Sequence, residues 1–85
     1  MKTVEIYTSS LCGFCHAAKR LLKKKGVKFT EISVDGDRAL RAKMTKRAQG
    51  RTSVPQIFIG KEHIGGCDEL HGLERQGALD IMLEG

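Results

Sequence analysis

Two cysteines separated by two residues, Cys12 and Cys15, are the residues of this chain best suited to chemistry, and His16 follows them directly. The spacing C-x-x-C serves dithiol redox chemistry and metal binding, and C-x-x-C-H also serves covalent haem attachment. The motif alone therefore leaves three hypotheses open: a redox pair, half of a zinc or iron–sulfur site, and a haem attachment site.

The remaining sequence offers haem and zinc little support. Haem attachment requires an exported chain, and the N-terminus has no apolar run before a small-residue cleavage site. A tetrahedral zinc site needs four ligands, commonly from a second C-x-x-C or an H-x₃₋₅-H pair, and the sequence contains neither. We therefore interpret Cys67 as structural and His16 as an exposed side chain on a charged helix face.

Length and composition indicate one domain, residues 1–85, because 85 residues with 40% hydrophobic composition suffice for one small core. The net charge of +5 lies mainly in "KRLLKKK" and "RALRAKMTKR", which predict solvated helix faces. With few aromatic residues and no apolar span, we expect no nucleic-acid or membrane partner. Because no export signal is seen, we expect a cytoplasmic location, and in such a reducing compartment a close cysteine pair is usually catalytic or metal-binding.

The elements around the motif follow from periodicity. "TVEIYT" alternates and is rich in β-branched and aromatic residues, so residues 3–8 predict a strand that ends just before the cysteines. Apolar residues at helical spacing in "FCHAAKRLL" predict a helix that Gly26 ends. "VKFTEISV", residues 27–34, predicts a second strand and completes a β-α-β unit.

Downstream, Asp37 caps a predicted helix that runs to Gly50, "VPQIFIG" and "KEHIGG" predict two antiparallel strands, and Asp68 caps a closing helix interrupted at glycines 72 and 77. The order β-α-β-α-β-β-α favours an α/β fold, a mixed sheet of four strands flanked by helices. The cysteines then lie at the carboxyl end of the first strand, where ligands usually bind.

Cys12 occupies the predicted start of the first helix. Unsatisfied backbone N–H groups and the positive end of the helix dipole favour a thiolate over a thiol there. Because the thiolate is the attacking form, we expect Cys12 to be the nucleophile. Cys15 lies one turn further on, within bonding reach of Cys12 and at the border of the apolar stripe, which suits a resolving thiol.

Two further segments are expected at the same end of the sheet. Pro55 begins a strand that should be central or nearly so, and a cis Val54–Pro55 bond is the usual explanation, with a trans proline on an edge strand as the alternative. A cis bond would turn the Val54 backbone outward, free to pair with an extended peptide. Gly65 and Gly66 allow close backbone approach, and a helix N-terminus near Asp68 suits a small molecule with charged ends.

The chain resembles the glutaredoxins, in particular their small bacterial dithiol type. The resemblance covers nearly the whole chain: "VEIYT", the C-x-x-C-H helix start, "SVPQIFIG" in place of the family's T-V-P segment and "HIGGCDEL" in place of its G-G-x-D segment. It implies the thioredoxin-like fold and a glutathione-disulfide oxidoreductase (thioltransferase) with glutathione as cosubstrate. Its implied partners are proteins with disulfides or glutathione mixed disulfides, ribonucleotide reductase among them.

The resemblance also implies roles for individual residues. Cys12 would attack the mixed disulfide and take up glutathione, which a second glutathione or Cys15 would remove. The Val54 backbone would pair with the cysteine of glutathione, residues 67–68 would hold its γ-glutamyl end and Arg41 its glycine carboxylate. The implied glutathione-binding residues are Phe14, Arg41, Ser53, Val54, Pro55, Gly66, Cys67 and Asp68.

Three residues depart from the family pattern. Gly13 and Phe14 stand where this type usually has C-P-Y-C, and Ser9 stands where relatives often carry a lysine, so the positive field on Cys12 would rest more on the helix itself. The C-G-F start is shared with the monothiol C-G-F-S glutaredoxins, which hold a [2Fe–2S] cluster between two subunits with glutathione as extra ligands. A second hypothesis therefore stays open: a dimeric cluster carrier with Cys12 as the metal ligand, and a monomer when no cluster is bound.

Overall fold

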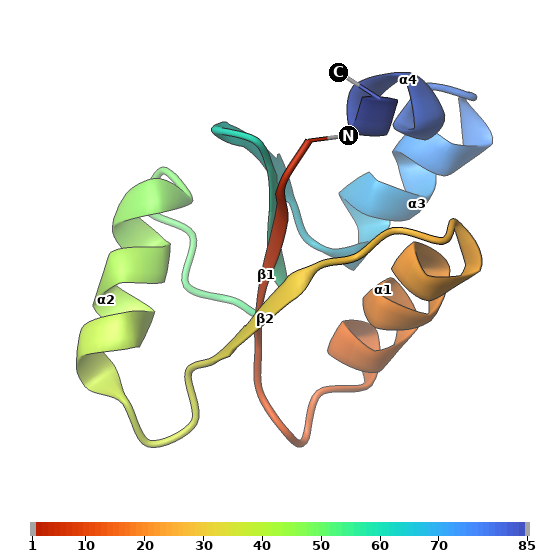
Figure 1. Ribbon diagram of the computed structural model, residues 1–85. Coiled ribbons are helices and arrows are strands. Elements are labelled where there is room, and N and C mark those ends of the chain that lie inside the picture. Colours follow the sequence, from red (N-terminus) through yellow and green to blue (C-terminus); the bar gives the residue numbers. More distant parts are fainter. Residues whose placement is uncertain (1, 85) are drawn as a thin grey trace.

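The computed structural model describes residues 2–84 and contains the predicted alternation of strands and helices (Figure 1). The closing helix is in two pieces, as predicted, and the break lies at Gly77, whose φ is 72°, whereas Gly72 lies inside a helix. The prediction of Asp68 as its cap was wrong, because the helix begins at Cys67 with Gly66 as N-cap and Asp68 lies within the first turn. The elements are β1 (Val4–Thr8), α1 (Gly13–Lys24), β2 (Thr30–Ser33), α2 (Arg38–Arg47), β3 (Gln56–Ile59), β4 (Glu62–Gly65), α3 (Cys67–Arg75) and α4 (Leu79–Glu84).

The four strands form one mixed sheet in the order β2-β1-β3-β4. β1 pairs parallel with β2, and β3 pairs antiparallel with both β1 and β4. The strand after Pro55 is thus an inner strand, as predicted, and the Val54–Pro55 peptide bond is cis. This arrangement directs the end of β1 and the start of β3 toward the same edge of the molecule.

The second strand is shorter than the prediction of residues 27–34. Gly26, with a φ of 72°, ends α1, and the Val27 N–H donates to the Leu22 carbonyl at 3.1 Å, which closes the helix. Val27 is buried by this turn, although it belongs to no ladder, because the pairing with β1 begins only at Thr30. The prediction from hydrophobic alternation therefore overestimated the length of this strand.

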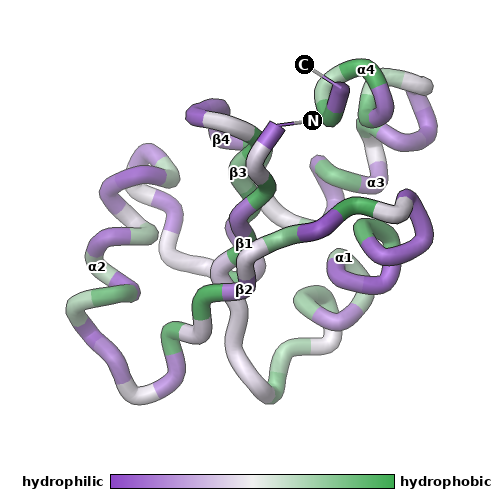
Figure 2. Tube along the Cα trace, viewed as in Figure 1, coloured by the Kyte–Doolittle hydropathy of each residue, from purple (hydrophilic) through white to green (hydrophobic). Residues whose placement is uncertain are grey.

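Helices cover both faces of the sheet (Figure 1): α1 and α3 lie on one side and α2 lies on the other. On the α1/α3 side, a larger core contains Val4, Ile6, Ala18, Leu21, Leu22, Val27, Ile57, Ile59, Leu70, Leu79 and Leu83. On the α2 side, a smaller core contains Tyr7, Val34, Met44, Ala48 and Phe58. Figure 2 shows hydrophobic residues gathered on β3 in the middle of the molecule and a mostly hydrophilic α2.

Contacts between distant segments tie the helices together at the far end of the sheet. The Lys25 ammonium lies 2.8 Å from Glu74 and 2.9 Å from Asp80, and these carboxylates raise the pKa of Lys25. The Lys2 N–H donates to the Leu83 carbonyl at 3.0 Å, so the two ends of the described chain lie together. Within residues 2–84, no helix has the length and apolar character needed to cross a membrane.

Candidate active site

Cys12 and Cys15 form a disulfide at the N-terminus of α1, with their Cα atoms 5.2 Å apart. Cys12 is the N-cap residue, with extended backbone angles, and its Sγ accepts the Cys15 N–H at 3.1 Å. A sulfur in this position takes the place of the oxygen of an ordinary capping side chain. Cys15 is fully buried whereas Cys12 is half-exposed, so the accessible sulfur is that of Cys12.

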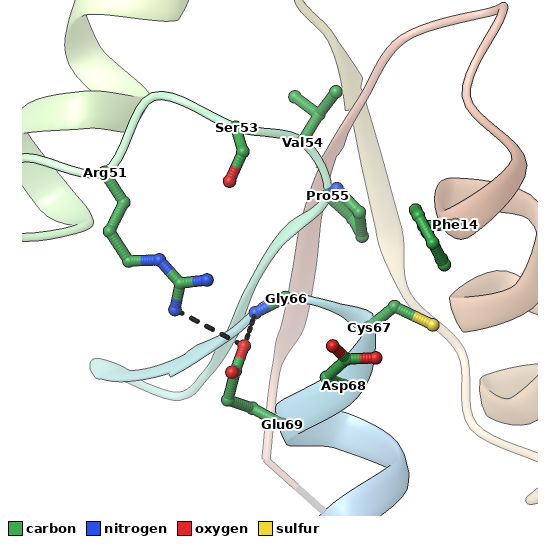
Figure 3. A pocket seen from close by; sticks show the side chains of 9 residues that line it. All are labelled: Phe14, Arg51, Ser53, Val54, Pro55, Gly66, Cys67, Asp68 and Glu69. Atoms are coloured by element: carbon green, nitrogen blue, oxygen red, sulfur yellow. Dashed lines mark hydrogen bonds and ion pairs between the residues drawn. The ribbon is translucent and has the colours of Figure 1, made fainter.

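The Cys12 sulfur lies at the edge of a pocket. Its Sγ is 3.6 Å from the Val54 carbonyl oxygen, at the cis peptide bond before β3. The pocket has a volume of about 180 Å³, with Phe14 opposite Pro55 and Cys67 (Figure 3). Its lining residues are Phe14, Arg51, Ser53, Val54, Pro55, Gly66, Cys67, Asp68 and Glu69. The structure thus brings together every residue expected to bind glutathione except Arg41.

Arg41 lies outside this pocket. Its Nη1 donates to the Thr52 carbonyl at 2.7 Å, and the side chain borders a separate depression beside the start of α2. Its bond to Thr52 braces the segment that leads into the pocket wall. Its role as a carboxylate ligand stays a prediction.

Arg51 and Glu69 line the pocket and were missed in the sequence. The Glu69 carboxylate accepts the Gly66 N–H at 2.6 Å and the Arg51 Nη1 at 3.3 Å (Figure 3). The Gly66 N–H lowers the pKa of Glu69, and the nearby guanidinium adds to the effect. Glu69 lies at the third position of α3 and accepts the N–H of the N-cap residue Gly66, which is the glutamate half of a capping box. Gly66 has no side chain to return the bond, so the usual Ser/Thr-x-x-Glu signal was missing from the sequence.

Gly65 is required beside this cluster. Its φ is 116°, which strains residues with a Cβ, and a Cβ here would lie 2.7 Å from Glu69 Oε1 and 2.9 Å from Arg51 Nη1. Close approach at Gly65 is thus to the Glu69 and Arg51 side chains, and the approach of a small molecule to the G-G segment stays a prediction.

Cys67 belongs to the pocket wall as a protonated thiol. Burial raises its pKa, the Asp68 charge raises it further, and Arg20 on α1 opposes them. Its Sγ lies 3.3 Å from His71 Nδ1, which also lies 2.9 Å from the Cys67 carbonyl oxygen. A thiol with a raised pKa is a poor nucleophile, so Cys67 does not duplicate the chemistry of Cys12.

A chain of hydrogen bonds through the buried Gln56 side chain supports the pocket wall formed by Ser53, Val54 and Pro55. Gln56 is fully buried, and its Nε2 donates to the Ser53 carbonyl at 2.9 Å and to Ser53 Oγ at 3.3 Å. Its Oε1 lies 2.7 Å from His63 Nε2, which must carry the proton because an amide oxygen only accepts. Burial lowers the pKa of His63. This chain of side chains fixes the backbone just before Val54.

Comparisons with known proteins agree with this geometry. A glutaredoxin family model matches residues 4–64. The chain belongs to the glutaredoxin family. It is 55% identical over 84 residues to glutaredoxin 3 of Escherichia coli K12, covering 99% of this chain and 100% of that protein.

Solved glutaredoxin structures have the same fold. A buckwheat glutaredoxin–glutathione complex matches with a TM-score of 0.88 and 31% identity, covering 98% of this chain and 77% of that chain. A structure described as "Metal Binding of Glutaredoxins" matches with a TM-score of 0.74 and 48% identity, covering 98% and 89%. The predicted thioredoxin-like fold is confirmed, and this glutaredoxin family member is a thiol–disulfide oxidoreductase with a redox-active cysteine pair.

The turn that precedes the redox pair in this family member is held by side chains from other elements. Asp35 accepts hydrogen bonds from the Ser9 hydroxyl at 2.8 Å and from the Ser10 N–H at 2.9 Å. Both bonds lower the pKa of Asp35, and the bond from the Ser9 hydroxyl has the larger effect. His16 is exposed, as predicted, and its Nε2 lies 3.3 Å from the Ser10 carbonyl oxygen. Ser9 thus helps to fasten this turn.

Proposed function

We propose that this chain reduces protein disulfides and glutathione mixed disulfides with glutathione as electron donor. Cys12 is the nucleophile and Cys15 is the resolving thiol. The observation that carries the proposal is the half-exposed Cys12 sulfur, which caps α1 at the edge of the pocket and faces the Val54 carbonyl.

The two cysteines perform different steps. In the reduced state, the Cys15 N–H and the helix dipole stabilise the Cys12 thiolate. The thiolate attacks a protein disulfide, forming a Cys12–protein disulfide and releasing one protein thiolate. Cys15 then attacks Cys12 Sγ, which forms the Cys12–Cys15 disulfide and releases the second protein thiolate. Two glutathione molecules reduce this disulfide and leave as glutathione disulfide.

The pocket offers a group for each polar part of glutathione. The Val54 backbone at the pocket wall can pair with the cysteine of glutathione, and the N–H groups at the start of α3 suit a carboxylate. Asp68 at the same helix end suits the ammonium of the γ-glutamyl group. Arg51, held by Glu69, is the guanidinium within the pocket lining and a candidate for the glycine carboxylate.

The test compares wild type, Cys12→Ser and Cys15→Ser in glutathione-dependent reduction of a mixed disulfide between glutathione and a small thiol. We expect Cys12→Ser to lose all measurable activity, because the nucleophile is gone. Cys15→Ser should keep activity on this substrate, since a second glutathione can release the first. Full activity in Cys12→Ser, or no activity in wild type, would contradict the proposal.

A second candidate function is a glutathione-dependent cluster carrier, favoured by Gly13 beside Cys12 and by the 48% identical relative described under metal binding. A [2Fe–2S] cluster takes four thiolates. Among residues 2–84, no group of three histidine, cysteine or acidic side chains gathers to hold a metal. Two copies would therefore each have to supply Cys12 and one glutathione.

Anaerobic reconstitution with iron, sulfide and glutathione tests this candidate. A cluster carrier gives a coloured species with twice the monomer mass, and omission of glutathione or the Cys12→Ser change abolishes it. A colourless monomer under all three conditions would rule the candidate out.

A further inference from the structure

Leu11, directly before the nucleophile, is an exposed apolar side chain that the pocket does not use. Its side chain is 98% exposed, compared with 68% for Phe14, which lines the pocket. The other exposed large apolar residue among those described is Ile81, on α4. A single exposed leucine is ordinary on a protein surface, but this one directly precedes the nucleophile. Any polypeptide joined to Cys12 therefore passes beside the Leu11 side chain, which is free to make an apolar contact with it.

The turn that carries Leu11 is braced. Asp35 holds Ser9 and Ser10 through two hydrogen bonds, and the His16 ring contacts the Ser10 carbonyl oxygen at 3.3 Å. On the other side of Leu11, Cys12 is fixed as the cap of α1. Bracing on both sides limits the backbone entropy that a partner would have to remove on binding, so Leu11 is preorganised for contact.

We propose that Leu11 binds an apolar side chain next to the cysteine of a polypeptide substrate. The inference rests on the proposed function, in which Cys12 forms a transient disulfide with the protein. Glutathione would occupy the pocket on the Phe14, Pro55 and Cys67 side, from which Leu11 is absent. The polypeptide attached to Cys12 is then the partner that reaches Leu11. This contact makes the chain select disulfides flanked by apolar residues.

The step that uses this contact is the first exchange. The Cys12 thiolate attacks one sulfur of the polypeptide disulfide, a Cys12–polypeptide bond forms, and the other polypeptide sulfur leaves as a thiolate. Burial of Leu11 against an apolar neighbour in this intermediate lowers the barrier for that substrate but does not act on a polar one.

The experiment uses two disulfide-linked homodimers of one short peptide, with leucine or serine next to the cysteine, so that attack on either sulfur gives the same product. For wild type we expect kcat/KM to favour the leucine peptide about five- to tenfold, which corresponds to partial burial of one leucine. In Leu11→Ser the ratio should fall to about one. Ile81→Ser, the matched loss of an exposed apolar side chain far along the chain, should keep the wild-type ratio.

A second measurement does not depend on glutathione turnover. Cys15→Ser attacks either homodimer and retains the peptide as a disulfide on Cys12. In the trapped leucine peptide, nuclear Overhauser contacts should join the Leu11 methyl groups to the peptide leucine, and the serine peptide should leave the Leu11 methyl shifts nearly unchanged.

The outcomes separate the two proposals. Lack of activity on the small glutathione mixed disulfide refutes the proposed function, while the trapped complex still reports on Leu11. An unchanged peptide ratio in Leu11→Ser, an equal loss on both peptides, or a trapped complex without contacts to Leu11 overturns the inference.

Discussion

The two faces of the sheet stabilise the molecule by different means. The α1/α3 face has the larger core, which is wholly apolar and includes side chains from the helix that carries the cysteines. The α2 face has the smaller core, and polar bonds supplement it: Arg47 donates to Tyr7 Oη at 2.8 Å and to Glu5 at 2.9 Å, and Gln56 joins His63 to Ser53.

This difference means that the two faces contribute differently to the site. Apolar burial has no preferred direction, so the larger core fixes where α1 lies but not the detailed direction of its polar groups. Hydrogen bonds are directional, so the α2 face can set the orientation of the Ser53–Pro55 wall. Substitutions in the larger core should therefore change stability most. Substitutions that remove the polar links of the α2 face should change the affinity of the pocket most.

The largest effect should follow from matched truncations in the two cores. Leu22 and Met44 are both fully buried, Leu22 in the larger core and Met44 in the smaller. We expect Leu22→Ala to cost about 4 kcal/mol and Met44→Ala about 2 to 3 kcal/mol, because α2 packs beside solvent and can collapse onto the gap. Urea unfolding measures both, and a larger cost for Met44→Ala would contradict the comparison.

Next in size is the loss of Gln56. Gln56→Leu should cost about 2 kcal/mol, because the half-buried His63 Nε2 and the Ser53 carbonyl both lose the hydrogen-bond partner that the buried Gln56 side chain provides. The loosened wall should also raise KM for a glutathione mixed disulfide about fivefold, corresponding to one lost hydrogen bond. Tyr7→Phe, which removes one bond from the same face but not from the pocket wall, serves as the control. Equal KM values for Gln56→Leu and Tyr7→Phe would contradict the claim that Gln56 orients the pocket wall.

A smaller effect is expected for Arg47. Its guanidinium carbon lies 4.1 Å from the centroid of the Phe58 ring, in addition to its bonds with Tyr7 and Glu5. Arg47→Met keeps much of the packing and loses the polar contacts, so we expect a loss of about 1 to 2 kcal/mol in thermal or urea unfolding. Lys46→Met, at the exposed neighbouring position, should change stability by less than about 0.5 kcal/mol.

The smallest effect is a pH dependence from His63. Burial lowers its pKa below the ordinary 6.5, so as the pH falls the unfolded chain binds a proton before the folded one does. Stability is complete above pH 6.5 and declines as the pH falls from 6.5 toward the lowered folded value. Urea titrations between about pH 7.5 and 5.5 should show this decline in wild type and a flatter profile in His63→Phe.

The shifted pKa values of acidic side chains do not interfere with that measurement. The pKa values of Glu31 and Glu69 are lowered from 4.5, and that of Asp35 from 3.8, so these groups lose their stabilising effect at lower pH. A profile of His63→Phe identical to wild type would show that the His63–Gln56 bond does not couple protonation to folding.

Much of the site could be predicted because it depends on local sequence. Cys12 precedes a strongly amphipathic segment, so its place at the start of α1 followed from helix periodicity and the strand before it. The Val54–Pro55 bond and the G-G segment carried their own signals in proline and glycine. The strand predicted from residue 27 was wrong at its beginning, because the helix-closing turn buries Val27 without any pairing.

The sequence by itself determined the redox pair, the order of the elements and the segments that face the cysteines, because these follow from backbone propensity and short-range periodicity. Only the tertiary structure decided which distant side chains meet. Arg51 contacts Glu69 across 18 positions, and Asp35 fastens Ser9 across 26. Such contacts depend on strand register and on side-chain direction, which no local pattern encodes, and they decide how the pocket and the Leu11 turn are held.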